Sequence, residues 1–548
     1  MIGPATEGSG HRTRTLPGRD LCAGLVIVAI AALVYRPVLQ LWWTLDDAFH
    51  LHFLTDHPHL SYLRPEVWRT LPFRMFTPLL FVSLETDLLL FGFSPWHFYM
   101  HQLIALILAS VATYVVFRLW FPLWIAFTGS VVVLLGVPVA SMAQQLMLRH
   151  YIEGWLLAAL AMAAFVAAVR RQSWPLASIS AVLYFGSALA KEIFVPLMLI
   201  LIVLPERSWR ERARFLIPHV FVLITYMAWR WIILGTFGGG YGWNTYQSEL
   251  PVVLAALPGR LTELMFPAVW GIVLVVIVAV GILPVLTSRH AARVLVAVAV
   301  SLAPIVPVAK SVEPRYAFAL WVTLIGSSFA GYFMFRRRTM LPLAIVAVLV
   351  ATVAVHRLFW NRTFAVAGRM SVEGRALMKM GGLDAIRNPA IPPAAMGELQ
   401  WMKTFVLRRP ATPFFYDDIF LCTPRPEIQR MFEYAPQSHG LRDVTAQMDC
   451  QKNLACAASL APLYAEFHYE DDVLAWEFGP YETGTYRVII ADGLQAFVVP
   501  RRDSFQLAAT VLEVRVRYDS PEGWRTYSDP IALDFSSRPR ERWERGKG

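Results

Sequence analysis

The dominant pattern along the chain is a series of long apolar runs separated by short polar connections. The first run, Leu21 to Leu41, is long enough to cross a bilayer at about 1.5 Å of rise per residue. A soluble protein would instead alternate apolar and polar positions, so that each helix or strand kept a polar face. The pattern therefore predicts a polytopic α-helical membrane protein.

Basic residues orient the runs, because arginine and lysine are enriched in cytoplasmic connections. The clusters at Arg170 and Arg171, at Arg207 to Arg214, and at Arg336 to Arg338 each mark the inner side. They predict about eleven spans, with the amino terminus in the cytoplasm and the carboxyl terminus outside. The expected spans are Leu21–Leu41, Trp96–Leu119, Leu123–Met142, Tyr151–Val169, Trp174–Leu204 (crossing twice), Phe215–Leu234, Pro267–Leu286, Val294–Ala309, Ala317–Phe335 and Leu341–Val355.

The chain is expected to have three parts. Residues 1–20 form a polar cytoplasmic tail, and residues 21–356 form the multi-span domain, with a long first outer loop at 42–95. Residues 357–548 form a soluble domain outside the cytoplasm. The first run is too long for a cleavable signal peptide and lacks a small-residue cleavage site, so we expect a retained signal anchor. Within the loop, Phe76–Phe91 is apolar but carries Glu85 and Asp87, which favours a helix lying in the membrane interface.

The carboxyl-terminal part has the pattern of a soluble α+β domain that is rich in β-structure. We expect a helix at Val372–Met380 and a strand at Pro413–Leu421. Further strands are expected where β-branched and aromatic residues concentrate, at Thr485–Ile490, Ala496–Val499 and Thr510–Tyr518. Cys422, Cys450 and Cys456 also lie here. Outside the cytoplasm one disulfide among the three is expected, most simply Cys450–Cys456, but their odd number leaves the pairing open.

Composition agrees with the membrane interpretation. The chain has 548 residues and is 56% hydrophobic, which at this length separates it from soluble multidomain proteins. The net charge of +10 is divided among short clusters between the spans. It therefore does not indicate a nucleic-acid partner, which would require a continuous basic surface.

Two adjacent carboxylates, Asp46 and Asp47, directly follow the first span. At the centre of a membrane helix a carboxylate costs about 2.5 to 3.5 kcal/mol on insertion scales, so the interface is the least costly position near lipid. Trp42 and Trp43 belong at the same level, because tryptophan is enriched at membrane interfaces. The pair is therefore expected at the depth of a lipid phosphate. The alternative is a solvated helix end.

Other ionisable groups recur at the corresponding outer depth. Arg315 has the planar fork that suits a phosphate, and Lys191 would add a point charge. Each also has a structural interpretation, as a cation at a span end for Arg315 and as an ion pair with Glu192 for Lys191. The further candidates are Glu313, Tyr316, His50, His52, His97 and His101. His50 and His52 could ligate a divalent metal, whereas His97 and His101, four residues apart on a helix, favour packing.

These motifs, in this order, resemble the GT-C class of membrane glycosyltransferases, and within it the protein O-mannosyltransferase and aminoarabinose-transferase branch. The motifs are Asp46-Asp47 after the first span, the long outer loop, Pro95-Trp96-His97 with His101 opening the second span, Lys191-Glu192 in a middle outer turn, and Glu313-Pro314-Arg315-Tyr316 opening a late span. The resemblance covers most of residues 20–356. The carboxyl-terminal domain does not match the mannosyltransferase branch, which leaves the acceptor open.

The resemblance implies an inverting transferase of the cell envelope, in a bacterial inner membrane. A sugar would pass from a polyprenyl-phosphate donor to a lipid, glycan or protein acceptor on the outer face. Asp46 or Asp47 would be the general base on the acceptor, with Asp46 favoured by the family pattern. Arg315, Lys191 and Tyr316 would contact the donor phosphate. Glu192, Glu313, His50, His97 and His101 would support the site, and no cofactor beyond an optional divalent metal is implied.

Two other functions are left open by the sequence. A transporter or flippase of lipid-linked sugars would place charged or Gly- and Pro-broken positions near mid-membrane and would show an internal repeat. No repeat is visible in the sequence, and the ionisable groups cluster at one surface. A non-catalytic scaffold for envelope assembly would use the β-rich domain as a binding module.

Overall fold

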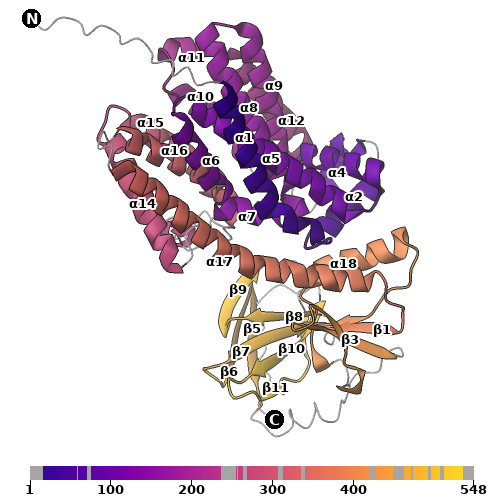
Figure 1. Cartoon of the computed structure of the whole chain (residues 1–548). Coiled ribbons are helices and arrows are strands. Elements are labelled where there is room, and N and C mark those ends of the chain that lie inside the picture. Colours follow the sequence, from indigo (N-terminus) through magenta and orange to yellow (C-terminus); the bar gives the residue numbers. More distant parts are fainter. Residues whose placement is uncertain are drawn as a thin grey trace, which may run out of the picture. The chain divides into compact units, whose positions relative to one another are not determined.

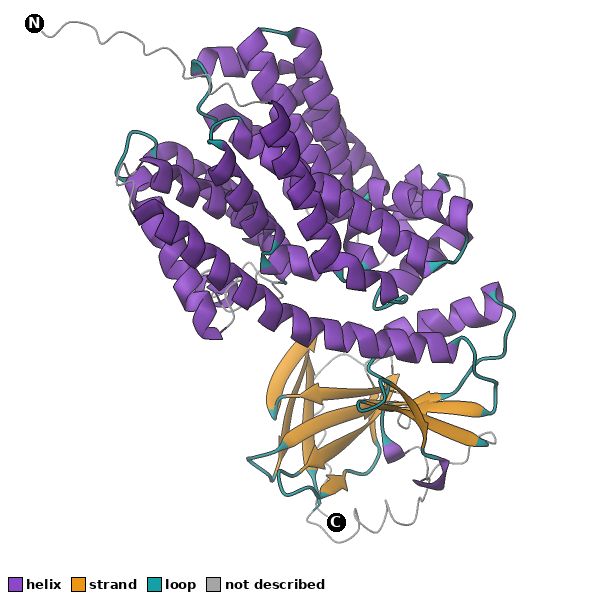
Figure 2. Ribbon diagram, in the orientation of Figure 1, coloured by secondary structure: helices purple, strands orange, loops and turns teal. Residues whose placement is uncertain are grey.

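The structure, a computed structural model, describes residues 17–57, 60–70, 76–235, 255, 257–262, 268–306, 313–334, 340–419, 428–447, 462–470, 473–490, 495–506 and 511–534. The chain divides into two compact units, Met1–Gly368 and Arg369–Gly548. Helices build the first unit, whereas the second combines strands and helices (Figure 2). The expected end of the membrane domain at residue 356 stays a prediction.

Seven helices of the described residues are long and apolar enough to cross a membrane, or up to eight if one bent pair is a single span. The seven are α1 (Pro17–Tyr35), α5 (Pro95–Arg118), α8 (Arg149–Arg171), α12 (Ile217–Leu234), α14 (Ala268–Leu286), α16 (Phe318–Met334) and α17 (Met340–Leu377). Shorter apolar helices are α9 (Trp174–Ala190), α10 (Leu197–Val203) and α15 (Ala291–Leu302). With the bent pair, these helices fall one for one on the expected spans. A polytopic α-helical fold is confirmed.

The bent pair consists of α6 (Leu123–Leu134) and α7 (Val137–Ala143), which meet at 55°. Pro138 lies at the start of α7, where its missing N–H is tolerated but would interrupt a continuous helix. Gly136 at the bend packs so closely on Trp321 that a Cβ there would lie 2.2 Å from the indole nitrogen. A close approach between α6, α7 and α16 therefore requires glycine at this position.

Helix α8 packs along both α5 and α9 (Figure 1). Its buried face is rich in alanine, including Ala158, Ala161 and Ala168, and Gly154 faces Phe194. Small residues let membrane helices approach closely, which explains the tight packing at the centre of this unit.

The stretch after α1, which includes the expected first outer loop, forms short helices. They are η1 (Arg36–Gln40), α2 (Asp47–Asp56), η2 (Ser61–Leu63), α3 (Pro65–Thr70) and α4 (Pro78–Phe91). The expected helix in the second half of the loop is therefore present as α4. Its two acids, Glu85 and Asp87, are buried rather than turned to an aqueous surface. The reason is that Tyr62 donates to Glu85 and Arg149 pairs with Asp87.

Three sheets build the second unit. A four-stranded sheet has the order β2-β1-β3-β4, and β1 is parallel to both β2 and β3. A five-stranded sheet has the order β11-β10-β7-β8, and β12 also pairs with β10. A three-stranded sheet has the order β5-β6-β9. The strands are β1 (Asp384–Arg387), β2 (Phe414–Phe415), β3 (Arg430–Ala435), β4 (Gly440–Asp443), β5 (Tyr464–Glu470), β6 (Val473–Gly479), β7 (Thr485–Ile490), β8 (Gln495–Val499), β9 (Arg502–Gln506), β10 (Val511–Asp519), β11 (Arg525–Tyr527) and β12 (Ile531–Asp534). Helix α18 (Pro393–Trp401) lies between β1 and β2 in sequence.

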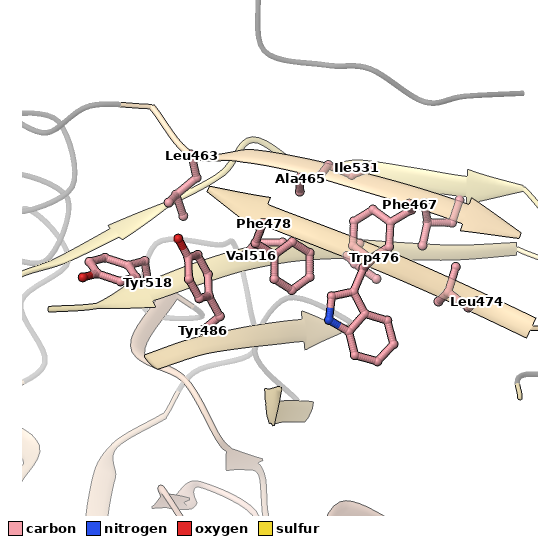
Figure 3. Packing of buried hydrophobic residues seen from close by; sticks show 12 residues of the cluster. Leu463, Ala465, Phe467, Leu474, Trp476, Phe478, Tyr486, Val516, Tyr518 and Ile531 are labelled. Atoms are coloured by element: carbon pink, nitrogen blue, oxygen red, sulfur yellow. The ribbon is translucent and has the colours of Figure 1, made fainter. Parts of the chain in front are cut away.

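The two antiparallel sheets enclose a common apolar core. Figure 3 shows Phe467, Trp476, Phe478, Tyr486 and Val516 gathered between the strands. On β6, residues 474, 476 and 478 are buried, whereas 473, 475 and 477 are half-buried, which is the period of two expected for a strand. The expected strands at Thr485–Ile490, Ala496–Val499 and Thr510–Tyr518 correspond to β7, β8 and β10, so the β-rich character of this domain is confirmed.

The expected helix at Val372–Met380 is present to Leu377 as the end of α17, which continues unbroken from the last expected span. No proline lies between Val355 and Val372 to interrupt it. Another local prediction was wrong in part. Of the expected strand at Pro413–Leu421, only Phe414 and Phe415 are strand in the described part. Beyond them, Asp417 and Asp418 turn to arginines, Arg517 and Arg387, of two different sheets. Cys422, Cys450 and Cys456 lie outside the described residues, so their pairing stays a prediction.

Candidate functional site

The acid pair lies where the first outer loop turns into α2. Leu45 adopts a left-handed backbone (φ 49°), Asp46 caps the helix, and Asp47 is its first residue. The two carboxylates consequently have different surroundings. Asp47 is buried, whereas Asp46 is exposed, and among the described residues no hydrogen bond or ion pair reaches its carboxylate.

Both oxygens of Asp47 are engaged. Its Oδ2 accepts from the backbone N–H of Thr44 at 2.9 Å, and its Oδ1 accepts from the backbone N–H of Met147 at 2.8 Å. Burial raises the pKa of Asp47 to about 7, although the two N–H donors oppose this. The Met147 contact links the outer loop to η3 (Leu146–Leu148), which directly precedes α8.

His50 lies one turn along α2. Its Nδ1 is 2.7 Å from the Asp46 carbonyl oxygen, and because a carbonyl only accepts, Nδ1 carries the proton and Nε2 is the free acceptor. Burial lowers the pKa of His50, and the Lys191 charge lowers it further. His50 is therefore a neutral imidazole at neutral pH, between Asp46 and Lys191.

Arg315 lies in η7 (Pro314–Ala317), just before α16. Its two terminal nitrogens, Nη1 and Nη2, each lie 2.7 Å from one carboxylate oxygen of Glu313, a two-pronged ion pair. The guanidinium also lies over the Tyr316 ring, 5.0 Å from its centroid. Among the described residues its buried Nε has no hydrogen-bond partner.

Lys191 lies at the break between α9 and η4 (Glu192–Phe194) and is buried. Its ammonium is 3.2 Å from the Glu192 carboxylate and lies over the Tyr151 ring at 5.7 Å. The rings of Tyr151 and Tyr316 in turn meet edge to face, with centroids 6.3 Å apart. Two cations from distant parts of the chain are thus held over two touching tyrosine rings.

His150 completes this cluster and was missed by the sequence analysis. It is buried at the start of α8, and its Nδ1 has no partner among the described residues. The charges of Lys191 and Arg315 act on its ring. The available signal was the adjacent pair Arg149-His150 at the opening of an apolar run.

The structure therefore brings most of the candidate residues together. Asp46 acts electrostatically on both His50 and Glu313, which connects the outer loop to the residues around Arg315. The cluster consists of Asp46, Asp47, His50, His150, Lys191, Glu192, Glu313, Arg315 and Tyr316.

His97 and His101 belong elsewhere. His97 stacks on Phe91 and its Nδ1 lies 2.8 Å from the Ser94 hydroxyl, which is a packing role. His101 joins a second polar network around the fully buried Arg149. There Arg149 pairs with Asp87 and donates to the Phe98 carbonyl and the Ser83 hydroxyl. Sequence analysis did not single out Arg149, because its partners come from two other segments, α4 and α5, far from it in the chain.

The suggested metal ligands do not converge. His50 is buried and held by the Asp46 carbonyl, whereas His52 pairs with Asp56 at 3.1 Å on the same helix. Residues two positions apart on a helix point about 200° apart. Across the described ranges, no group of three or more His, Cys, Asp or Glu residues could hold a metal ion.

An apolar cavity of about 560 Å³ begins beside the cation cluster. Its walls come from α5, α8, α10, α15 and α16. Three aromatic residues of its wall lie about one helical turn after residues of the cluster. They are Trp155, four residues after Tyr151, and Phe194 and Phe318, three residues after Lys191 and Arg315. Trp120 and Arg293 line the other end. The cavity therefore extends along the helices away from the charged groups.

No family model matches the chain, and no curated protein matches it. Among solved structures it is similar to the oligosaccharyltransferase AglB from Archaeoglobus fulgidus in complex with an inhibitory peptide and a dolichol-phosphate, with a TM-score of 0.44 and 11% identity over 88% of this chain and 76% of that chain. The oligosaccharyltransferase from Archaeoglobus fulgidus in complex with Zn and sulfate gives a TM-score of 0.43 and 12% identity, over 87% of this chain and 75% of that chain. ArnT from Cupriavidus metallidurans bound to undecaprenyl phosphate gives a TM-score of 0.42 and 13% identity, over 80% of this chain and 95% of that chain.

Proposed function

We propose that the protein is an inverting glycosyltransferase that moves a sugar from a polyprenyl-phosphate donor to an acceptor hydroxyl or amine. The observation that carries the proposal is the cation cluster. Arg315 and Lys191 are held over the touching rings of Tyr316 and Tyr151, beside the exposed carboxylate of Asp46 and at one end of an apolar cavity.

Each part matches one need of the reaction. The cavity would take part of the apolar lipid chain, since its walls offer almost only hydrocarbon. Arg315 and Lys191 would bind the phosphate, and Tyr316 would fix the guanidinium plane. As the bond between the anomeric carbon and the phosphate oxygen breaks, charge develops on the phosphate, where fixed cations stabilise it.

Asp46 is our candidate for the general base. Its carboxylate is the one of the pair that an acceptor can reach, and it would take the acceptor's proton as the new glycosidic bond forms at the anomeric carbon. Asp47, with both oxygens engaged by backbone N–H groups, would orient the turn that carries Asp46.

The experiment is transfer by purified protein from a panel of radiolabelled polyprenyl-phosphate sugars. Asp46→Asn keeps the shape of the side chain but removes the base, so the rate should fall by about 10² to 10⁴ while donor binding survives. The matched control is Asp56→Asn, which removes an exposed acid from the same helix and should transfer at the parental rate. Parental transfer by Asp46→Asn would overturn the assignment of the base.

The panel also separates the alternatives. A flippase or a scaffold would give no labelled product with any donor, and Asp46→Asn would not change its behaviour.

A further inference from the structure

Glu313 occupies both terminal nitrogens of Arg315 in this structure. Nη1 and Nη2 each contact one oxygen of the Glu313 carboxylate at 2.7 Å. A phosphate that bound the fork of the guanidinium through these two nitrogens would compete with Glu313 for them.

A buried guanidinium needs such a partner. The Arg315 side chain is only 10% exposed, and leaving a buried charge unpaired is strongly unfavourable. A ligand phosphate can replace the carboxylate as counter-ion, but the pair must then open. Glu313 and a lipid phosphate are thus alternative partners of one cation.

Glu313 is placed so that it can withdraw. Its side chain is 47% exposed, and its backbone is extended, just before the Pro314 that begins η7. Burial raises the pKa of Glu313, and the nearby Asp46 carboxylate raises it further. Both effects disfavour the negative charge of Glu313 at this position, which makes it easier to displace from Arg315. The other cation of the cluster, Lys191, differs from Arg315, because it contacts its neighbour Glu192 through one ion pair at 3.2 Å and not through a two-pronged one.

The charge of the lipid changes during the proposed reaction. A sugar-linked lipid phosphate is a diester with one negative charge, whereas the released lipid phosphate is a monoester with about 1.5 to 2 negative charges at neutral pH. Two fixed cations would bind this product more tightly than the donor and would slow its departure.

We propose that Glu313 is an internal competitor for Arg315 that speeds release of the lipid phosphate product. This inference rests on the proposed function and adds to it a step, product release, with a residue assigned to it. Glu313 would be displaced as charge develops on the phosphate and would return to Arg315 as the product leaves.

The test is equilibrium binding of undecaprenyl phosphate, without a sugar, to the purified full-length chain. Glu313→Gln removes the competing charge but keeps the size of the side chain, so binding should become tighter by about ten-fold. In Glu313→Asp the side chain is too short to bridge both nitrogens in the same way. The affinity of this variant for undecaprenyl phosphate should lie between that of the parent and that of Glu313→Gln. Asp56→Asn, on α2, controls for the loss of one negative charge elsewhere in the chain, and neutral undecaprenol controls for binding of the lipid chain alone.

A second readout is product inhibition during transfer. Added undecaprenyl phosphate should inhibit Glu313→Gln at about one tenth of the concentration that inhibits the parent. Equal or weaker binding by Glu313→Gln would overturn the inference and would make Glu313 a fixed support of Arg315. In that case the parent would still bind the lipid phosphate and transfer sugar, so the proposed function would stand. If neither protein bound the lipid phosphate, both proposals would fall.

Discussion

The two adjacent aspartates show how far neighbouring residues can differ. Asp46 and Asp47 share a turn, yet adjacent helical positions point about 100° apart, and only Asp47 points inward. The left-handed Leu45 and the distant backbone N–H of Met147 fix this difference. The sequence predicted an acidic pair at the outer end of the first span. It could not tell which of the two aspartates is buried and which is exposed, because Met147, whose N–H binds Asp47, lies 100 residues away in the sequence.

The raised pKa of Asp47 predicts a pH dependence of stability. Since the folded-state pKa is above that of the unfolded chain, this group contributes stability that is fully present below about pH 4 and is lost as the pH rises through about 7. The thermal unfolding midpoint of the purified protein should therefore fall across this window, and Asp47→Asn should flatten the fall.

The control is Asp56→Asn, which removes an exposed acid from the same helix and should keep the parental slope. A parental slope in Asp47→Asn would show that other groups cause the pH dependence.

At the scale of single elements, α8 combines two roles on one turn. Arg149 turns to Asp87 and the polar network of α4 and α5, while the next residue, His150, joins the cation cluster. Anchoring Arg149 also fixes η3, whose Met147 holds Asp47. The second network therefore supports the candidate site through the backbone, without contributing a side chain to it.

This network predicts strong coupling between Arg149 and Asp87. Arg149→Met removes the charged partner of the buried Asp87 carboxylate and leaves it only the contact with His101, which should cost about 3–5 kcal/mol of unfolding free energy. The double variant Arg149→Met, Asp87→Asn removes both charges and should recover most of that loss. Reversible unfolding in detergent, compared among the parent, both single variants and the double variant, measures the coupling.

An exposed pair of the same type provides the comparison. Arg207 and Glu211 lie one turn apart on the surface, so Arg207→Met should change stability by about 0.5 kcal/mol or less. Additive effects of the Arg149 and Asp87 substitutions would contradict a coupled buried pair.

The apolar runs predicted the helices well but not their interruptions and continuations. The run Leu123–Met142 bends because Pro138 interrupts it, and this proline was visible in the sequence. The continuation of α17 to Leu377 was not predicted, because the pattern changes there from apolar to polar without any helix-breaking residue. A change of environment along a helix does not require the helix to end.

On the scale of the whole molecule, the sequence predicted a helical membrane protein with a β-rich carboxyl-terminal part, as the structure has it. The strands β7, β8 and β10 were visible because β-branched and aromatic residues concentrate in them. The ion pairs that join the sheets of the second unit were not predicted. Asp418 accepts from both Arg387 of β1 and Arg525 of β11, which are far apart in sequence.

The last prediction concerns the orientation of the whole chain. Basic clusters occur at every second connection between the expected spans, and an odd number of crossings places the two ends on opposite sides. A reporter that is active only outside the cytoplasm should therefore give signal when fused after Gly548 and none when fused before Met1. The full chain is retained in both fusions, so its folding is not compromised by truncation. A reversed pattern would move Asp46, Lys191 and Arg315 to the cytoplasmic face, and the same reading from both fusions would show that one of the shorter helices, α9, α10 or α15, does not cross the membrane.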